Sequence, residues 1–220
     1  MAKIYLVRHG QASFEADNYD ELSALGYEQS SAVGAFFKDQ GVCFDEFWCG
    51  TLNRHQQTLA KIIFELELVE KPEVNLTADL NEYDFKKIIK NYIELNNLSN
   101  TYNKKEYISL LRSSLSAWQD AELIIPSNET WIDFTQRLVK FCTEQKDKHK
   151  SQKNILVVAS GGSCSAIIQN ILDLKNDKFI DLNIQTANCA ITEIYFNEKN
   201  MWLSGFNNLI HLGKNLITYI

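Results

Sequence analysis

The sequence contains little proline and little glycine, with 2 Pro and 9 Gly among 220 residues. So few of these residues exclude a collagen-like chain and leave no flexible linker that would divide the chain into two domains. A surplus of basic residues is also missing, because 22 Lys and Arg stand against 28 Asp and Glu and give a net charge of −6. Binding to nucleic acid or to an anionic membrane through a basic surface is therefore not expected.

Paired cysteines and long apolar runs are absent as well. The five cysteines are widely spaced and form no C-x-x-C pair, which argues against a zinc or redox cluster and against a disulfide scaffold. No run of 18 apolar residues occurs, and residues 1–8 lack the apolar stretch of a signal peptide. We therefore expect a cytoplasmic protein with no membrane partner.

The length of 220 residues suits one domain, which we assign to residues 1–220. Apolar patterns predict strands that alternate with helices. The predicted strands are 4–7, 44–48, 74–77, 155–159, 190–196 and 201–206, and the predicted helices are 22–39, 54–66 and 164–172. This alternation predicts an α/β fold, a three-layer α/β/α sandwich with a mostly parallel central sheet.

Residues 83–126 differ from the rest because they show helical periodicity and no convincing strand. We interpret them as a helical insertion between elements of the sheet. This segment contains the basic residues Lys86, Lys87, Lys90, Lys104, Lys105 and Arg112. They could line a site for an acidic substrate, but we favour a solvated helix face, since isolated surface charges need no function.

Three predicted strands end in unusual residues. The first is followed by Arg8, His9 and Gly10, the second by a segment that leads to Arg54, and the strand at 155–159 by Ser160 and two glycines. Ligands of open α/β sheets gather at the carboxyl ends of the strands. Arginine binds phosphoryl oxygens through two hydrogen bonds, and a helix that begins after glycine directs free N–H groups at an anion. The three ends together predict a site for a phosphoryl group.

Each of these elements is weak by itself. His9 alone could be a histidine whose hydrogen bonds are satisfied at the end of a strand, and Arg54 alone could be a surface residue at the start of a helix. The prediction depends on their joint occurrence at successive strand ends.

The motifs resemble the histidine phosphatase (phosphoglycerate mutase-like) superfamily over nearly the whole chain, and residues 8–14 resemble a bacterial subgroup of it. The segments that carry the resemblance are Leu6-Val7-Arg8-His9-Gly10-Gln11, the block from Thr51 to Ala60, Leu80-Asn81-Glu82, Glu129 to Arg137, and Asn188-Cys189-Ala190-Ile191-Thr192. The resemblance implies a phosphatase that needs no metal or other cofactor.

The resemblance also implies a role for each matched residue. His9 would attack phosphorus and form a phosphohistidine, and Glu82 would protonate the leaving oxygen and then activate water, which requires a raised pKa. Glu82 could instead be an exposed helix-cap carboxylate. The implied phosphate-binding residues are Arg8, Gln11, Ser13, Arg54, Ser160 and Gly161.

One position departs from the family pattern, which has a second active-site histidine where this chain has Ser160. Loss of one preorganised donor to the transition state costs about 10²–10³ in rate, roughly 3–4 kcal/mol. Of the other histidines, we expect His211 to be structural, His55 to face away from the site, and His149 to be exposed.

Two classes of function follow. The first is a slow phosphomonoester phosphatase that acts on a phosphorylated small molecule or a phosphoprotein. The second is a catalytically impaired relative that binds a phosphorylated ligand. A mutase is the least expected, because it must capture and reorient a phosphorylated intermediate without the second histidine. We favour the phosphatase, because a binding module has no need to keep a nucleophile and an acid.

Overall fold

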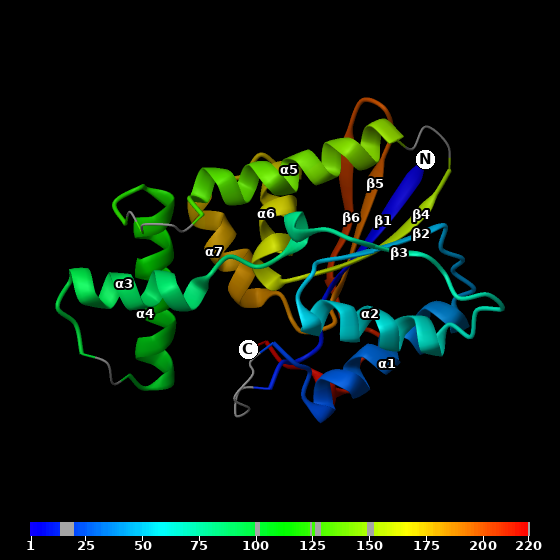
Figure 1. Cartoon of the computed structure of the whole chain (residues 1–220), viewed down its shortest axis with the longest axis horizontal. Helices are drawn as coiled ribbons and strands as arrows, with labels where there is room; N and C mark the ends of the chain where they lie inside the picture. Colours follow the sequence, from blue (N-terminus) through cyan, green and yellow to red (C-terminus); the bar gives the residue numbers. More distant parts are fainter. Residues whose placement is uncertain (14–19, 100–101, 124, 126–128, 149–151, 220) are drawn as a thin grey trace.

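A single sheet forms the centre of the molecule. In residues 1–13, 20–99, 102–123, 125, 129–148 and 152–219, which the computed structural model describes, this sheet has six strands in the order β3-β2-β4-β1-β5-β6 (Figure 1). The strands are β1 (Ala2–Arg8), β2 (Glu46–Cys49), β3 (Val74–Leu76), β4 (Asn154–Ala159), β5 (Ile191–Phe196) and β6 (Met201–Asn208). Strands β1 to β4 pair in parallel, whereas β5 is antiparallel to β1 and to β6. The mostly parallel sheet predicted from the sequence is confirmed.

Helices cover both faces of this sheet (Figure 1). They are α1 (Ala24–Asp39), α2 (Asn53–Glu65), α3 (Phe85–Leu95), α4 (Lys104–Gln119), α5 (Trp131–Lys148), α6 (Gly161–Ile171) and α7 (Asn176–Gln185), with short 3-10 helices η1 (Ala78–Leu80) and η2 (Lys214–Leu216). Successive residues of β1 point to opposite faces. Tyr5 and Val7 pack in one apolar cluster with α1 and α2, while Ile4 and Leu6 pack in a second cluster with α5 and α6. The three-layer arrangement is confirmed.

The apolar runs 4–7 of β1 and 155–159 of β4 follow from the central position of these strands. Parallel strands that are covered on both faces bury every side chain, so their sequences do not alternate with polar residues. Residues 155–159 of β4 are all 0% exposed. Each buried Val, Leu or Ile side chain stabilises the fold by about 1.5–3 kcal/mol. The sheet is therefore a rigid base for the groups that follow its strands.

The insertion forms helices α3 and α4, and its described residues contain no strand. Figure 1 shows these helices as a green projection at one end of the molecule. The Asp84 side chain caps α3 by accepting a hydrogen bond from the Lys87 N–H at 3.0 Å, and Asn103 and Glu106 form a capping box on α4. The ring centroid of Trp118 in α4 lies 5.8 Å from that of Phe134 in α5, and this contact joins the insertion to the core.

Two helices go beyond the sequence prediction. Helix α5 extends to Lys148, well past the matched segment that ends at Arg137, and α7 was not predicted at all. Helix α7 buries only Phe179 and Ile180 fully, so its apolar pattern is too short to reveal a helix.

The cysteines of the described chain are free thiols, Cys43 exposed and the other four buried. Burial raises the pKa of Cys49, Cys142 and Cys189 to about 12, so these thiols are protonated at neutral pH. Among the described residues, no helix is long and apolar enough to span a bilayer, and no group of three or more His, Cys, Asp or Glu is arranged to hold a metal ion.

Candidate active site

The loop after β1 holds His9 in a fixed position. The His9 N–H donates to the Ala159 carbonyl of β4 at 2.9 Å, and the Asn188 side chain donates to the His9 carbonyl at 3.2 Å. Gly10 allows the backbone to lie close against α1, because a Cβ at this position would lie 2.4 Å from the Gly26 carbonyl oxygen. The end of β1 is thus joined to β4, to α1 and to the segment before β5.

The contacts of the His9 ring define its tautomer. Its Nδ1 lies 2.6 Å from the Gly10 carbonyl oxygen, and its Nε2 lies 3.2 Å from the Arg54 Nε. A carbonyl only accepts and a guanidinium only donates, so the proton is on Nδ1 and the lone pair is on Nε2. Burial lowers the pKa of His9 well below its usual value, and the positive charge of Arg54 adds to this effect. The ring is therefore neutral at pH 7, and its Nε2 lone pair is unprotonated and accepts a hydrogen bond from Arg54.

Arg54 connects three of the groups at this edge of the sheet. It is the second residue of α2 and is only 6% exposed. Besides its contact with His9, its guanidinium forms an ion pair with Asp20 at 2.7 Å and donates to the Ser160 hydroxyl at 3.4 Å. This buried cation can bind phosphoryl oxygens next to the His9 lone pair.

Arg8 supplies a second cation. Its guanidinium donates to the carbonyl oxygens of Thr186 and Tyr219, the latter at 2.6 Å. Gly161 makes room for it, since a Cβ at this glycine would lie 3.2 Å from the Arg8 Nε. The C-terminal segment therefore helps to orient this arginine beside the start of α6.

Glu82 lies at the start of helix α6, where the helix dipole favours a negative group. One carboxylate oxygen accepts from the Gly162 N–H at 3.1 Å and the other from the Tyr83 N–H at 3.3 Å. Desolvation raises the pKa of Glu82, and the hydrogen bond from Gly162 and the charges of Arg54 and Arg8 oppose this increase only in part. A Cβ at Gly162 would lie 2.2 Å from this carboxylate, so only glycine permits the contact.

Arg137 of α5 holds the segment that leads to Glu82. Its guanidinium binds both carboxylate oxygens of Glu129, at 2.5 and 3.0 Å, and donates to the Asp79 carbonyl oxygen at 2.5 Å. Such a two-point contact fixes the direction of the guanidinium as well as its position. The matched segment from Glu129 to Arg137 therefore holds the backbone that leads to Glu82 and does not itself line the site.

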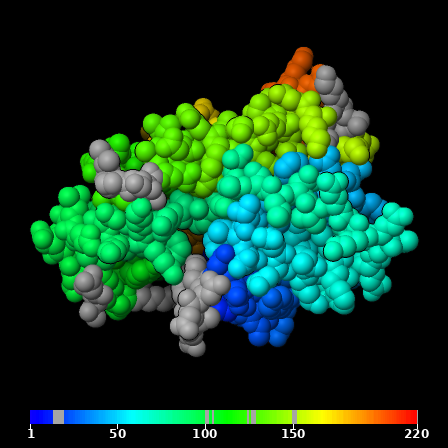
Figure 2. All heavy atoms as spheres, viewed as in Figure 1, coloured from blue at the N-terminus to red at the C-terminus, as the bar shows by residue number. Residues whose placement is uncertain are grey.

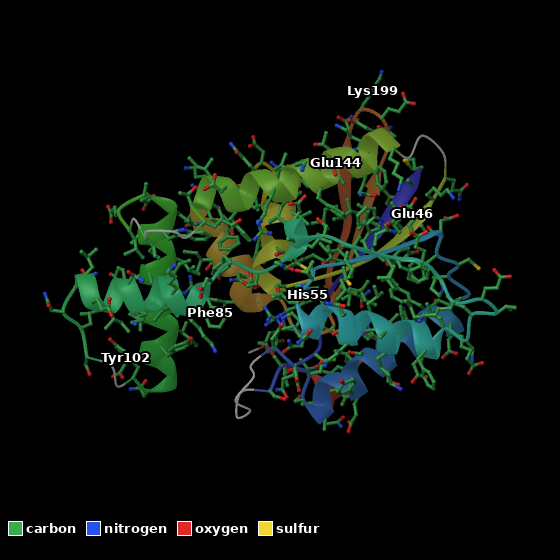
Figure 3. All side chains as sticks on the ribbon, in the orientation of Figure 1. Glu46, His55, Phe85, Tyr102, Glu144 and Lys199 are labelled. Carbon is green, nitrogen blue, oxygen red and sulfur yellow. The ribbon has the colours of Figure 1, made fainter. Side chains whose placement is uncertain are left out.

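The expectation that His55 faces away from the site is wrong. His55 is 0% exposed, its Nε2 lies 2.7 Å from the Ser160 Oγ, and its ring centroid lies 5.5 Å from that of His9. Figure 3 labels His55 at the start of α2. The signal was present in the sequence, because His55 lies four and seven residues before Leu59 and Ile62 and so shares their buried helix face.

A comparison with protein families matches the chain to a model described as the histidine phosphatase superfamily (branch 1), over residues 4–209. The chain belongs to this superfamily.

Solved structures of several other proteins share this fold. A phosphoglycerate mutase from Bacillus anthracis is 16% identical with a TM-score of 0.68, and the match covers 96% of this chain and 94% of that one. A putative alpha-ribazole-5'-P phosphatase from Escherichia coli is 21% identical with a TM-score of 0.68, covering 94% and 96%. A phosphoserine phosphatase from Entamoeba histolytica, solved with 3-phosphoglyceric acid, is 21% identical with a TM-score of 0.68, covering 96% and 100%. At such identities the likeness shows the fold alone.

Gln11 and Ser13, the other residues predicted to bind phosphate, have contacts that lead elsewhere, and so do the histidines outside the predicted site. The Gln11 side chain accepts from the Ser23 hydroxyl at 2.9 Å, and the Ser13 N–H donates to the Glu21 carbonyl at 2.8 Å. His211 contacts the Cys189 carbonyl oxygen at 2.9 Å and packs against Phe36. His149 lies outside the described residues. A phosphate-binding role for Gln11 and Ser13 stays a prediction.

A pocket adjoins Arg8 and Glu82 in this histidine phosphatase-like site. Its other lining residues come from the insertion and from α7: Tyr83, Phe85, Tyr107, Leu111, Asn183 and Ile184. Figure 2 shows the surface hollowed between the green insertion and the cyan residues of α2, and Figure 3 labels Phe85 at the insertion side of this recess. Of the basic insertion residues, Lys90 forms an ion pair with Glu94 and Arg112 forms one with Asp181. The side chains that the insertion supplies to the pocket are aromatic or aliphatic.

Stability should depend on pH through the histidines. Burial lowers the pKa of His9, His55 and His211 in the folded protein, so the unfolded chain binds more protons just below pH 6.5. The free energy of unfolding is therefore expected to fall as pH decreases from 6.5 toward the folded pKa values. His55→Gln should make this slope shallower by up to about 1.4 kcal/mol per pH unit, measured by urea denaturation at pH 5.5, 6.0, 6.5 and 7.5. Glu82 contributes equally to the pH dependence of the wild type and of His55→Gln. Equal slopes of the unfolding free energy in these two proteins would therefore contradict a depressed pKa at His55.

Proposed function

We propose that the protein is a phosphomonoester phosphatase that acts through a phosphohistidine on His9 and needs no metal ion. The observation that carries this proposal is the state of the His9 ring: its Nδ1–H donates to the Gly10 carbonyl oxygen, and its Nε2 lone pair faces the Arg54 guanidinium. A neutral imidazole with an unprotonated nitrogen is a nucleophile, and a phosphoryl group that takes over the hydrogen bonds of Arg54 would lie within reach of this nitrogen.

In the first step, His9 Nε2 attacks phosphorus and the bond from phosphorus to the leaving oxygen breaks. Glu82 is protonated at this stage and gives its proton to the leaving oxygen, for which its raised pKa is suited. Arg54 and Arg8 stabilise the charge on the other phosphoryl oxygens, and Gly161, the first residue of α6, directs a backbone N–H toward them. The product of this step is an alcohol and a phosphohistidine.

In the second step, water attacks phosphorus opposite His9 Nε2. The Glu82 carboxylate takes the proton of the attacking water, the bond from phosphorus to nitrogen breaks, and inorganic phosphate leaves. The neutral His9 ring and the protonated Glu82 are both regenerated. No oxidant or further co-reactant is required for the cycle.

Ser160 favours a second candidate, a protein that binds a phosphorylated ligand without turnover. The family pattern has a histidine at this position, and a serine hydroxyl is a weaker donor to a phosphoryl group. The phosphatase remains our proposal because a binding protein needs neither a neutral nucleophile nor a carboxyl group with a raised pKa. A phosphorylated small molecule or phosphoprotein as substrate, the lack of a nucleic-acid partner and a cytoplasmic location stay predictions.

The decisive test is incubation of the wild-type protein with a simple aryl phosphate in the presence of a metal chelator. We expect inorganic phosphate to be released, and an acid-labile phosphoryl group to be found on His9 by mass spectrometry after rapid quenching. Absence of both turnover and label, together with binding of inorganic phosphate, would establish the binding protein instead.

A further inference from the structure

His55 and Ser160 form a buried polar pair beside the nucleophile. Both residues are 0% exposed, and the His55 Nε2 lies 2.7 Å from the Ser160 Oγ. Ser160 precedes the first residue of α6, yet its hydroxyl caps no N–H group of that helix. Burial of a hydroxyl and an imidazole is costly unless hydrogen bonds satisfy both groups. The pair therefore needs an explanation beyond the capping of α6.

The surroundings of His55 define which atom of the pair donates. A Cβ added at Gly50 would lie 2.2 Å from the His55 Nδ1, so a Cα hydrogen of this glycine points at that nitrogen. A proton on Nδ1 would collide with this Cα hydrogen. A lone pair on Nδ1 can instead accept the Cα hydrogen as a weak C–H contact. In the described residues Nδ1 has no hydrogen-bond partner. The His55 proton is therefore on Nε2, from which it donates to the Ser160 oxygen.

This assignment leaves the hydroxyl proton of Ser160 available. A serine oxygen has two lone pairs and one proton. One lone pair accepts from His55 Nε2 at 2.7 Å, and the other accepts from the Arg54 Nη2 at 3.4 Å, because a guanidinium can only donate. Neither contact uses the hydroxyl proton, and the Arg54 guanidinium that contacts Ser160 also contacts His9 Nε2.

We propose that the Ser160 hydroxyl donates a hydrogen bond to the transferring phosphoryl group and that His55 is the positioning residue that directs it there. This inference rests on the proposed phosphoryl site. Without His55, the hydroxyl proton is free to rotate toward the imidazole space and the donor is lost for part of the time. With it, one neutral serine supplies a fixed donor in the place where the family pattern has a histidine.

The test compares three single variants with the wild type. Ser160→Ala removes the donor, His55→Met fills the imidazole space without any N–H, and His55→Gln places an amide N–H close to the former Nε2 position. We expect Ser160→Ala and His55→Met each to lower kcat/KM for an aryl phosphate about 10- to 100-fold, the worth of a hydrogen bond to a charged group. His55→Gln is expected to recover most of the loss seen in His55→Met.

The double variant Ser160→Ala with His55→Met separates positioning from packing. If His55 acts through Ser160, the second substitution adds less than about 3-fold to the first, because two residues that act as a unit are not additive. A full additional loss, or a failure of His55→Gln to recover activity, would overturn the proposal. Thermal unfolding of each variant identifies any loss that comes from misfolding, and Ser160→Ala, the smallest change, decides the role of the hydroxyl by itself.

Calorimetric binding of inorganic phosphate and of vanadate keeps this test independent of turnover. If the wild type binds phosphate but does not hydrolyse the ester, the proposed phosphatase activity is wrong. The role of Ser160 and His55 in phosphate binding is still tested, by the loss of affinity in Ser160→Ala and His55→Met. Unchanged affinity for phosphate and vanadate in both variants would overturn the proposal that Ser160, positioned by His55, donates to the phosphoryl group. This result would do so even if the wild type were an active phosphatase.

Discussion

Replacement of His9 by alanine is expected to abolish phosphate release and to remove the acid-labile label. The mechanism passes through a bond from phosphorus to His9 Nε2, whose lone pair lies next to the Arg54 guanidinium. Removal of a nucleophile that forms a covalent intermediate lowers kcat by at least about 10⁴-fold. The measurement is continuous release of phosphate from an aryl phosphate, with mass spectrometry of the quenched protein.

The matched control is His211→Gln, because His211 is also buried in part but contacts the Cys189 carbonyl and Phe36 outside the site. It should keep wild-type turnover within about 3-fold. The His9→Ala protein should still bind inorganic phosphate, since Arg54 is also held by Asp20 and keeps its place without the imidazole. Turnover above about 1% of wild type in His9→Ala would exclude His9 as the nucleophile, whatever the affinity for phosphate.

The sheet could be predicted from sequence because its central strands are buried on both faces. Continuous apolar runs such as residues 155–159 have few structural alternatives, and helices between them require a parallel arrangement. Helix α7 could not be predicted, because only two adjacent residues, Phe179 and Ile180, are buried, and two buried side chains do not define a period. The pairing order β3-β2-β4-β1-β5-β6 also depends on contacts between distant segments that no local pattern encodes.

The site was predictable to the extent that strand ends carry it. His9, Arg54 and Ser160 follow three neighbouring strands, and their parallel pairing brings them to one edge. The partners that orient them lie elsewhere: Asp20 precedes α1, and the Tyr219 carbonyl belongs to the C-terminal segment. Neither residue stands in a motif, so only the folded chain reveals that they hold the two arginines.

His55 shows how a local interpretation can fail at such a site. Next to Arg54 in the sequence, it was expected to point in another direction, since successive helix residues are about 100° apart. Both side chains nevertheless reach the site, because the start of α2 lies against the glycine at position 50, which leaves room for the imidazole. The lack of a side chain at Gly50 therefore allows His55 to reach the site.

Replacement of Glu82 by glutamine is expected to lower kcat/KM for an alkyl phosphate by about 10²–10⁴-fold. The amide keeps the size of the side chain but has no proton to give to the leaving oxygen. The leaving group of an aryl phosphate is acidic and needs little protonation. The substitution should therefore lower the rate of the first step far less for this ester than for the alkyl phosphate. Hydrolysis of the phosphohistidine also lacks its base in this variant, and the labelled intermediate should therefore accumulate after a burst of the released phenol.

The pH dependence sharpens this prediction. Burial raises the pKa of Glu82, and only the protonated acid can assist departure of the alcohol, so kcat/KM of the wild type for the alkyl ester should fall as pH rises through that pKa. The low pKa of His9 keeps the nucleophile neutral at acidic pH, which leaves Glu82 in control of the alkaline limb.

Glu82→Gln should lose this limb, whereas the control Glu144→Gln, on the exposed face of α5 (Figure 3), should retain it. An identical alkaline limb in Glu82→Gln would assign the acid to another group, and an equal loss for both esters would show that the carboxylate positions substrate and transfers no proton.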